Sequence, residues 1–113
     1  MFADALKNRR IIVPARGFYE WAPDRTRYRF YPADGSLFYM AGVYCRYDGK
    51  NRFVILTREA DETVRPIHDR MPVLLQAKDL EEWIMEPAST MQLMQNSRIA
   101  LERQTDYEQL SLF

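Results

Sequence analysis

The sequence predicts an α+β domain in which an antiparallel, β-rich sheet curls strongly or closes into a barrel, with a few helices at its rim. Three observations indicate this class. Short runs rich in β-branched and aromatic residues fill most of residues 10–57, and turn-forming sequences separate them. Apolar residues at the helical spacing i, i+3 and i+4 follow late in the chain, at Leu80, Trp83 and Ile84. Strands joined by tight turns pair antiparallel, which fixes the expected direction of the sheet.

The N-terminal half of the chain is expected to contain one short helix followed by strands. Residues 3–9 hold good helix formers, although a helix this short is marginal by itself. Residues 10–14, 17–22 and 26–31 are typical of strands, and the proline- and aspartate-containing link at 22–25 indicates a turn between the last two.

The central strands are separated by two further turns. Strands are expected at residues 37–47 and 52–57. The Pro-Ala-Asp-Gly sequence at 32–35 predicts a hairpin between the strand that precedes it and the strand that follows. The Asp-Gly pair at residues 48–49 is the sharpest turn signal of the chain and predicts a second hairpin.

The pattern changes after Thr57. Residues 59–64 are polar and are expected to form one or two helical turns that Thr57 caps and Pro66 ends. Residues 71–75 indicate another strand. Apolar side chains at i, i+3 and i+4 then predict a helix at residues 77–85, and a second short helix is expected at 89–95. The tail from Ser97 onward has only a weak pattern.

Composition bounds the class of protein. The chain has 113 residues, 47% of them hydrophobic, which suits one domain with a single modest core over residues 1–113. Its formal net charge is zero, so no global attraction for nucleic acid exists. A local basic cluster in the first third of the chain can still hold phosphates. Its members are Lys7, Arg9, Arg10, Arg16, Arg25, Arg27 and Arg29.

Several kinds of site are excluded by the same counts. One cysteine, Cys45, allows no disulfide within the chain and fits a reducing compartment. No apolar run reaches about eighteen residues, so no membrane span is expected and the predicted location is cytoplasmic. One histidine and one cysteine cannot supply three or four nitrogen and sulfur ligands, which argues against zinc. We expect neither a metal nor a cofactor.

Two segments suggest acid–base chemistry. His68 is the only histidine, and its ordinary pKa near neutrality suits proton transfer at pH 7. Glu20 lies among three aromatic residues in segment 17–21, where burial would favour its protonated form. The alternatives are a hydrogen-bonded structural histidine and a solvated strand carboxylate; alternation alone favours the latter, with Phe18 on the face of Glu20.

Three motifs of the chain resemble the SRAP family, the SOS-response-associated peptidases, which shield abasic sites in single-stranded DNA. The motifs lie at residues 10–21, 53–57 and 67–75, in the order and spacing of the family. Residues 41–44, between the first two motifs, and Trp83, after the third, agree as well. The resemblance covers about residues 5–85 and implies an SRAP-like fold.

The resemblance implies a particular reaction. In the family, removal of the initiator methionine leaves an N-terminal cysteine, whose amine and thiol capture the aldehyde of an abasic site as a thiazolidine crosslink. The family also carries a self-processing peptidase activity. A glutamate and a histidine assist, and they correspond to Glu20 and His68 here. Arg70 corresponds to an arginine expected to face the DNA backbone.

Four further expectations concern residues around the acid–base pair. Arg70 contacts phosphate or pairs with a nearby acid. Arg16, which stands where the family usually has an acid, is a weaker candidate for DNA contact. Trp21 stacks on a base or belongs to the core, the commoner fate of tryptophan. Thr57 either orients His68 or only caps the segment after it.

The chain also departs from the family pattern. It begins Met-Phe, without the Met-Cys-Gly start, and an earlier motif with an asparagine is absent. We therefore expect an N-terminally shortened SRAP domain that keeps Glu20 and His68 but forms no crosslink. The alternatives are a non-covalent DNA- or protein-binding module and an inactive remnant. Loss of neighbouring strands also predicts an open sheet edge near residues 11–13, covered by formation of a homodimer.

Overall fold

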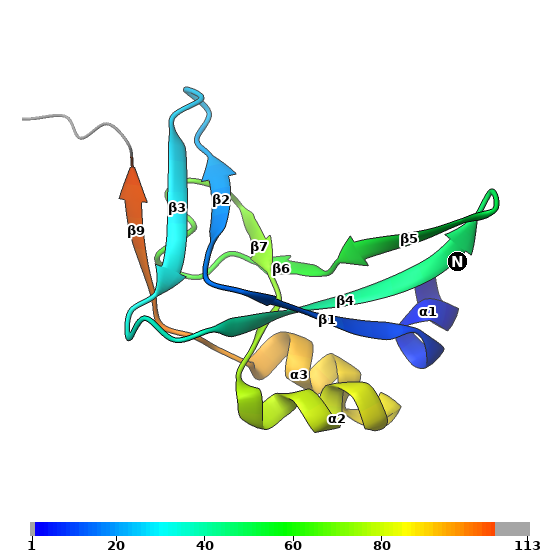
Figure 1. Cartoon of the computed structure of the whole chain (residues 1–113). Coiled ribbons are helices and arrows are strands. Elements are labelled where there is room, and N and C mark those ends of the chain that lie inside the picture. Colours follow the sequence, from blue (N-terminus) through cyan, green and yellow to red (C-terminus); the bar gives the residue numbers. More distant parts are fainter. Residues whose placement is uncertain (1, 106–113) are drawn as a thin grey trace, which may run out of the picture.

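The computed structural model describes residues 2–105, which form two antiparallel sheets, a two-stranded ladder and short helices (Figure 1). A four-stranded sheet has the order β1-β4-β5, with β8 also paired to β4. A three-stranded sheet has the order β2-β3-β9, and β6 pairs with β7. The strands are β1 (Arg10–Ala15), β2 (Phe18–Trp21), β3 (Arg27–Pro32), β4 (Phe38–Tyr47), β5 (Lys50–Ile55), β6 (Thr57–Glu59), β7 (Arg70–Pro72), β8 (Leu74–Leu75) and β9 (Leu101–Thr105).

The helices are short: one precedes β1, and two lie between β8 and β9. They are α1 (Phe2–Asn8), α2 (Leu80–Met85) and α3 (Thr90–Asn96), with single 3-10 turns η1 (Ala77–Asp79) and η2 (Pro87–Ser89) leading into the last two. The α+β class and the antiparallel direction are thus confirmed. The barrel alternative is wrong, because the sheets do not close and β1 has β4 as its sole strand partner among the described residues.

The predicted hairpin across residues 32–35 is wrong, although the turn itself forms. The Gly35 N–H donates to the Pro32 carbonyl, and Gly35 has the positive φ that such a turn favours. However, β3 pairs with β2 and β9, whereas β4 pairs with β1, β5 and β8. The chain therefore crosses between sheets here, so that Phe30 of one and Phe38 of the other are buried in a common core.

The hairpin at residues 48–49 is confirmed. Asp48 and Gly49 both have positive φ, and they join β4 to β5 in antiparallel register from Gly42 opposite Ile55 to Tyr47 opposite Lys50. Two positive φ values are the signature of the type I′ turn, whose twist matches that of the strands.

The expected strand at 71–75 splits into β7 and β8, which pair with different partners. Val73 lies at the junction, where its N–H donates to the Leu56 carbonyl and its own carbonyl accepts from Ala41. The expected strand at 52–57 breaks in the same region, between β5 and β6. Backbone hydrogen bonds are thus kept while the chain changes partner.

The helical turns expected at 59–64 are wrong, and so is their cap at Thr57. Thr57 belongs to β6, and the segment after it is a series of hydrogen-bonded turns. The cap is Asp61, whose carboxylate accepts the N–H groups of Thr63 and Val64 at 2.9 and 3.0 Å. An aspartate is a good acceptor for such orphan N–H groups, and pairing with β7 holds Thr57 extended.

Helices α2 and α3 pack against one face of the four-stranded sheet (Figure 1). Trp83 is fully buried in the cluster that they form with Ala41, Val73, Leu75 and Leu93. Its indole N–H donates to the Ile11 carbonyl, so its one polar group is satisfied. A second cluster around Phe18, Phe30 and Phe38 fills the space between the sheets.

Strand β9 has no counterpart among the sequence-based expectations. Its residues are mostly charged or polar, and four of the five are exposed or half-buried, so alternation gives little signal. It forms because β3 offers an unpaired edge, to which β9 pairs from Tyr28 opposite Thr105 to Pro32 opposite Leu101. Leu101 anchors this strand in the core between the sheets.

Candidate functional site

Strand β2 directs Glu20 toward the region between the sheets. Side chains alternate along the strand, and Phe18 on the same face is buried, with its ring stacked on Phe30 at a centroid distance of 5.1 Å. Gly17 precedes the strand, where an added Cβ would lie 2.7 Å from the Phe30 carbonyl oxygen. The backbones therefore approach closely at this point, which fixes the register that places Glu20 opposite Tyr28.

His68 is positioned by the turn that Asp61 caps. The His68 N–H donates to the Val64 carbonyl at 2.9 Å. Val64 and Ile67 are buried in the core between the sheets and anchor this turn against it. The chain then enters β7 two residues later. His68 is therefore held between a packed turn and a paired strand.

The two predicted acid–base residues lie together. Glu20 Oε1 and His68 Nε2 are 3.8 Å apart, although the residues are distant in the sequence. The side chains remain 25% and 44% exposed, respectively. The distance is longer than a hydrogen bond, so the pair has room for a small adjustment or for one bridging group. The predicted convergence of these side chains is confirmed.

The other ring nitrogen of His68 faces the backbone of Arg70. His68 Nδ1 lies 3.1 Å from both the Arg70 N–H nitrogen and the Arg70 carbonyl oxygen. When Nδ1 accepts the N–H, the neutral ring carries its proton on Nε2, the atom that faces Glu20. When the ring is doubly protonated, Nδ1–H has the carbonyl as an acceptor. Both protonation states of His68 thus find a partner in the same orientation.

Arg70 contacts Thr57 across the β6–β7 ladder. Its guanidinium donates to the Thr57 carbonyl at 3.0 Å and to the Thr57 hydroxyl at 3.3 Å. Thr57 therefore contacts Arg70, and the contacts described for residues 2–105 show no bond from Thr57 to His68. The ion pairs described within this range do not join Arg70 to Asp61 or Asp69 either. Arg70 consequently lies beside His68 with its charge unopposed by these acids.

Arg16 and Trp21 lie apart from this pair. Arg16 is exposed in the bend between β1 and β2, where its carbonyl accepts from Arg29. Trp21 follows Glu20 and therefore points to the opposite, outer face of the three-stranded sheet, with 53% of its surface exposed. The interpretation of Trp21 as a core residue is wrong. The reason is that the core lies on the inner face of this sheet only.

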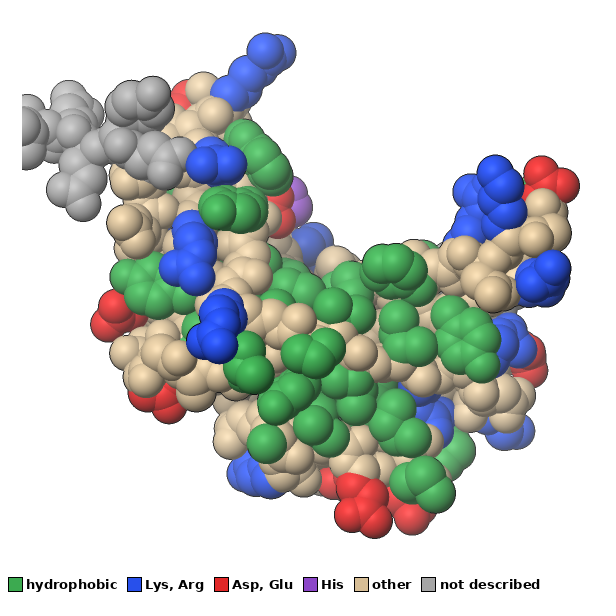
Figure 2. All heavy atoms as spheres, in the orientation of Figure 1, with side chains coloured by type: hydrophobic (Ala, Val, Ile, Leu, Met, Phe, Trp, Pro, Cys, Tyr) green, Lys and Arg blue, Asp and Glu red, His purple; other side chains and the backbone are tan. Residues whose placement is uncertain are grey.

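The outer face of the three-stranded sheet carries a feature that the sequence reading missed. Two arginine–tyrosine stacks lie on it: the Arg27 guanidinium is 4.5 Å from the Tyr19 ring centroid, and the Arg29 guanidinium is 5.0 Å from that of Tyr31. Figure 2 shows basic and hydrophobic side chains alternating along the arm that holds β2 and β3. The alternation of arginine and aromatic residues at 27–30 was the available signal.

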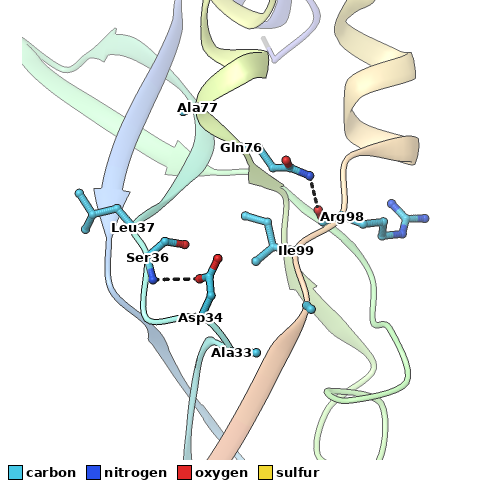
Figure 3. Close-up of a pocket in the computed structure, with 9 residues that line it drawn as sticks. Ala33, Asp34, Ser36, Leu37, Gln76, Ala77, Arg98 and Ile99 are labelled. Carbon is cyan, nitrogen blue, oxygen red and sulfur yellow. Dashed lines mark hydrogen bonds between the residues drawn. The ribbon is translucent and has the colours of Figure 1, made fainter.

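A separate cavity lies at the other end of β3, by the turn at residues 33–36 (Figure 3). Its volume is about 420 Å³. Asp34 points into it and accepts the Ser36 N–H at 2.9 Å, while the Gln76 amide donates to the Arg98 carbonyl. Neither Glu20 nor His68 is among the residues that line this cavity. Glu20 and His68 thus lie outside this cavity.

The fold and the site together define an α+β domain in which a glutamate and a histidine, Glu20 and His68, meet at the inner rim of a small antiparallel sheet. The model of the SOS response associated peptidase (SRAP) family matches residues 1–111, and the chain belongs to this family. It is 33% identical over 92 residues to the abasic site processing protein YoaM of Bacillus subtilis and 31% identical over 96 residues to YedK of Escherichia coli. These matches cover 74% and 79% of the chain.

Solved structures show the same fold. A protein from Bordetella bronchiseptica superposes with a TM-score of 0.80 at 24% identity, covering 95% of this chain and 59% of that one. A protein from Bacteroides thetaiotaomicron gives 0.76 at 25% identity, with coverages of 92% and 52%. The matches to YoaM and YedK span only 40% and 43% of those proteins. This chain thus corresponds to about half the length of its relatives.

Proposed function

We propose that this chain contributes the acid–base half of an abasic-site-processing centre, acting on single-stranded DNA. The observation that carries the proposal is the 3.8 Å approach of Glu20 Oε1 to His68 Nε2 in a chain whose relatives are named abasic site processing proteins. The family resemblance adds a protective DNA–protein crosslink and self-processing peptidase activity, both of which need an N-terminal cysteine. The reaction proposed for the chain's own residues is proton transfer.

The proton transfers are needed when an aminothiol meets the abasic aldehyde. The amine nitrogen attacks the aldehyde carbon, a C–N bond forms, and the resulting carbinolamine must lose its hydroxyl group as water. Glu20 accepts the proton that the amine releases and returns it to the former carbonyl oxygen, which becomes the hydroxyl; His68 donates a second proton to this hydroxyl as it departs as water. The thiol sulfur then adds to the iminium carbon, and its proton returns to His68. The products are one thiazolidine and one water.

Arg70 is proposed to bind the phosphate next to the abasic site. A guanidinium donates two hydrogen bonds at once to a phosphate, and Thr57 holds this one at 3.0 and 3.3 Å. Its backbone also contacts the His68 ring at 3.1 Å, so binding of a phosphate and placement of the acid–base pair are linked through a single residue. Thr57 is a support for this arginine in the proposal.

The proposal can be tested by supplying the aminothiol separately. A polypeptide of these 113 residues starts with Met-Phe, so incubation with an abasic oligonucleotide is expected to give no heat-stable band on a denaturing gel. With free cysteine added, the chain is expected to accelerate thiazolidine formation on the oligonucleotide. An acceleration on the order of a hundredfold is what one positioned acid–base group supplies.

Glu20→Gln and His68→Gln are expected to remove most of that acceleration, and Arg70→Ala is expected to weaken binding of the oligonucleotide. Glu62→Gln is the matched control, because Glu62 is an exposed carboxylate in the turn that Asp61 caps and that positions His68. Equal acceleration by the wild type and by both site variants would contradict the proposed roles. A stable covalent band without added cysteine would show that another nucleophile, such as Cys45, reacts.

We also propose that β1 pairs with β1 of a second copy of the chain. The open edge expected near residues 11–13 is present, since β1 pairs with β4 alone among the described strands and its apolar residues are only partly buried. Pro14 lacks an N–H, so the edge offers few donors and the dimer is expected to be weak. Light scattering is expected to show an average mass that rises with concentration. A constant mass of 13.5 kDa would contradict pairing.

A further inference from the structure

The outer face of the three-stranded sheet gathers aromatic and basic side chains that the acid–base pair does not use. Directly opposite residues share a face, so Tyr19 lies beside Arg29 and Trp21 beside Arg27 on this side. Tyr31 continues the row toward β9. Tyr19 and Trp21 are 49% and 53% exposed. Large rings exposed on a sheet face are a reason to look for a partner.

The arginines on this face lie over tyrosine rings. Arg27 lies over Tyr19 at 4.5 Å and Arg29 over Tyr31 at 5.0 Å. Arg29 also donates to the Arg16 carbonyl at 3.3 Å. A guanidinium that stacks on a ring keeps its N–H groups at its edge, in the plane where phosphate oxygens bind. The face therefore alternates flat π surfaces with phosphate-binding groups.

The charges of this face favour an anionic partner. Its strand residues include the basic side chains of Arg27 and Arg29, whereas Glu102, opposite Tyr31 on the edge strand β9, is the acid among them. Arg16, exposed at the start of β2, adds a third positive charge next to the row. Single-stranded nucleic acid matches this combination, because its bases stack on rings and guanidinium planes while its phosphates meet arginines.

We propose that the outer face of the three-stranded sheet binds single-stranded nucleic acid without sequence preference, as an extension of the abasic-site centre on the inner rim. The two surfaces meet at β2, where Glu20 and Trp21 are consecutive residues on opposite faces. A strand that leaves the inner rim over the end of β2 reaches the outer row directly. The proposal rests on the proposed function for its partner, and it adds a second contact surface.

Binding of fluorescent oligothymidine without any abasic site tests this surface. Tyr19→Ala is expected to weaken binding of a strand of about twelve nucleotides by roughly fivefold or more, as removal of a stacking ring does. It is expected to leave unchanged the binding of a strand of about four nucleotides that carries a stable abasic analogue, which covers the inner rim alone. Tyr19→Phe keeps the ring and is expected to retain the wild-type affinity for both.

Tyr47→Ala is the matched control. Tyr47 is 56% exposed and is also stacked with an arginine, Arg52 at 5.7 Å, but at the tip of the β4–β5 hairpin. Unchanged binding of the longer strand by Tyr19→Ala, or an equal loss in Tyr47→Ala, would overturn the proposal. Direct binding of a fluorescent polyaspartate peptide, with no binding of oligothymidine, would also overturn it, in favour of an acidic protein.

The outcome separates this inference from the proposed function. The wild-type protein could bind oligothymidine through Tyr19 but show no preference for an abasic analogue and no acceleration of thiazolidine formation with cysteine. In that case the outer binding surface is supported and the abasic-site centre is contradicted. If the abasic analogue is preferred and Tyr19→Ala changes the binding of neither the longer nor the shorter strand, the abasic-site centre is supported and the outer binding surface is contradicted. Circular dichroism of each variant confirms that loss of binding does not come from unfolding.

Discussion

The two sheets of this molecule are both antiparallel, but they differ in which of their faces other elements cover. Helices α2 and α3 seal one face of the four-stranded sheet, and Trp83 is fully buried beneath it. The three-stranded sheet has a packed inner face but an open outer one, on which Tyr19 and Trp21 are about half exposed. The first sheet therefore holds the fold together, while the second displays side chains that are free to meet a partner.

The arginines follow the same division. Arg10 donates to the Trp83, Ile84, Leu6 and Lys7 carbonyls and so links two helix ends to β1. A cation at the carboxyl end of a helix satisfies orphan carbonyls, which is a structural role. Arg70, by contrast, lies exposed beside His68, and the described hydrogen bonds of its guanidinium go to Thr57 alone. Basic residues that look alike in the sequence thus bond helix ends in one region and lie exposed in the other, where a binding role is proposed for Arg70.

The comparison predicts the largest loss of stability in the four-stranded sheet. Trp83→Ala removes a fully buried side chain and its hydrogen bond to the Ile11 carbonyl. The free energy of unfolding is expected to fall by about 3–5 kcal/mol. Urea denaturation measures it, with Ile84→Ala as the neighbouring exposed control, for which we expect less than about 1 kcal/mol. Equal losses from both variants would show that α2 is not a core element.

A smaller loss is expected where the two sheets meet. A Cβ added by Gly17→Ala would lie 2.7 Å from the Phe30 carbonyl oxygen, so β2 must shift against β3. We expect a cost of about 1–3 kcal/mol in unfolding free energy. The shift is also expected to displace Glu20 and to reduce cysteine-dependent thiazolidine formation.

Gly49→Ala is the control for that prediction. Its added Cβ meets no atom within 4 Å, but Gly49 has a φ of +75°, so a cost of about 1 kcal/mol from backbone strain alone is expected. Because Gly49 is in the distant β4–β5 turn, the acceleration by the acid–base pair should stay unchanged. An equal loss of acceleration in both variants would mean that the Gly17 effect is general destabilisation.

Replacing the acid–base pair should barely affect folding. Glu20→Gln removes one partner of a partly exposed ion pair at 3.8 Å, and such pairs contribute less than about 1 kcal/mol. We therefore expect Glu20→Gln to lose the acceleration of cysteine-dependent thiazolidine formation while its urea midpoint stays close to that of the wild type. A loss of stability as large as that of Trp83→Ala would instead assign Glu20 to the structural framework.

The smallest effect is expected from the turn that joins β2 to β3. Its Asp24 carboxylate accepts the Thr26 N–H at 2.9 Å, and this backbone hydrogen bond is the main reason that the pKa of Asp24 is lowered. A lowered pKa means that the ionised carboxylate stabilises the folded state above its unfolded pKa. This contribution is lost as the pH falls through the folded pKa.

The measurement is the difference in melting temperature between wild type and Asp24→Asn. A small advantage of the wild type at pH 7 is expected to vanish on acidification, as the pH falls through the lowered pKa of Asp24 and the carboxylate gains its proton. Asp34→Asn is a parallel case, because hydrogen bonds from the Ser36 side chain and from the Ser36 N–H lower the pKa of Asp34. An advantage that grows on acidification would have the wrong sign and would exclude this account.

Local sequence signals decided much of this structure. Alternation and turn chemistry gave the β1, β2 and β3 strands and the Asp48–Gly49 hairpin, since these depend on residues that are close in the chain. Helical spacing gave α2, although its first turn is a separate 3-10 turn, η1. The motif match gave Glu20 and His68 as a pair, and their proximity is confirmed, whereas their roles stay proposals.

Only the tertiary structure decided which strands pair and which side chains meet. The turn at 32–35 looks like a hairpin locally, but burial of Phe30 and Phe38 from two sheets sends its strands apart. Strand β9 lacks a pattern of its own and exists because β3 offers it an edge. Likewise, Trp21 is exposed because just one face of its sheet is packed. Hairpins and strands are set by neighbours in the sequence, whereas sheet order and exposure are set by burial between distant segments, which a single sequence does not encode locally.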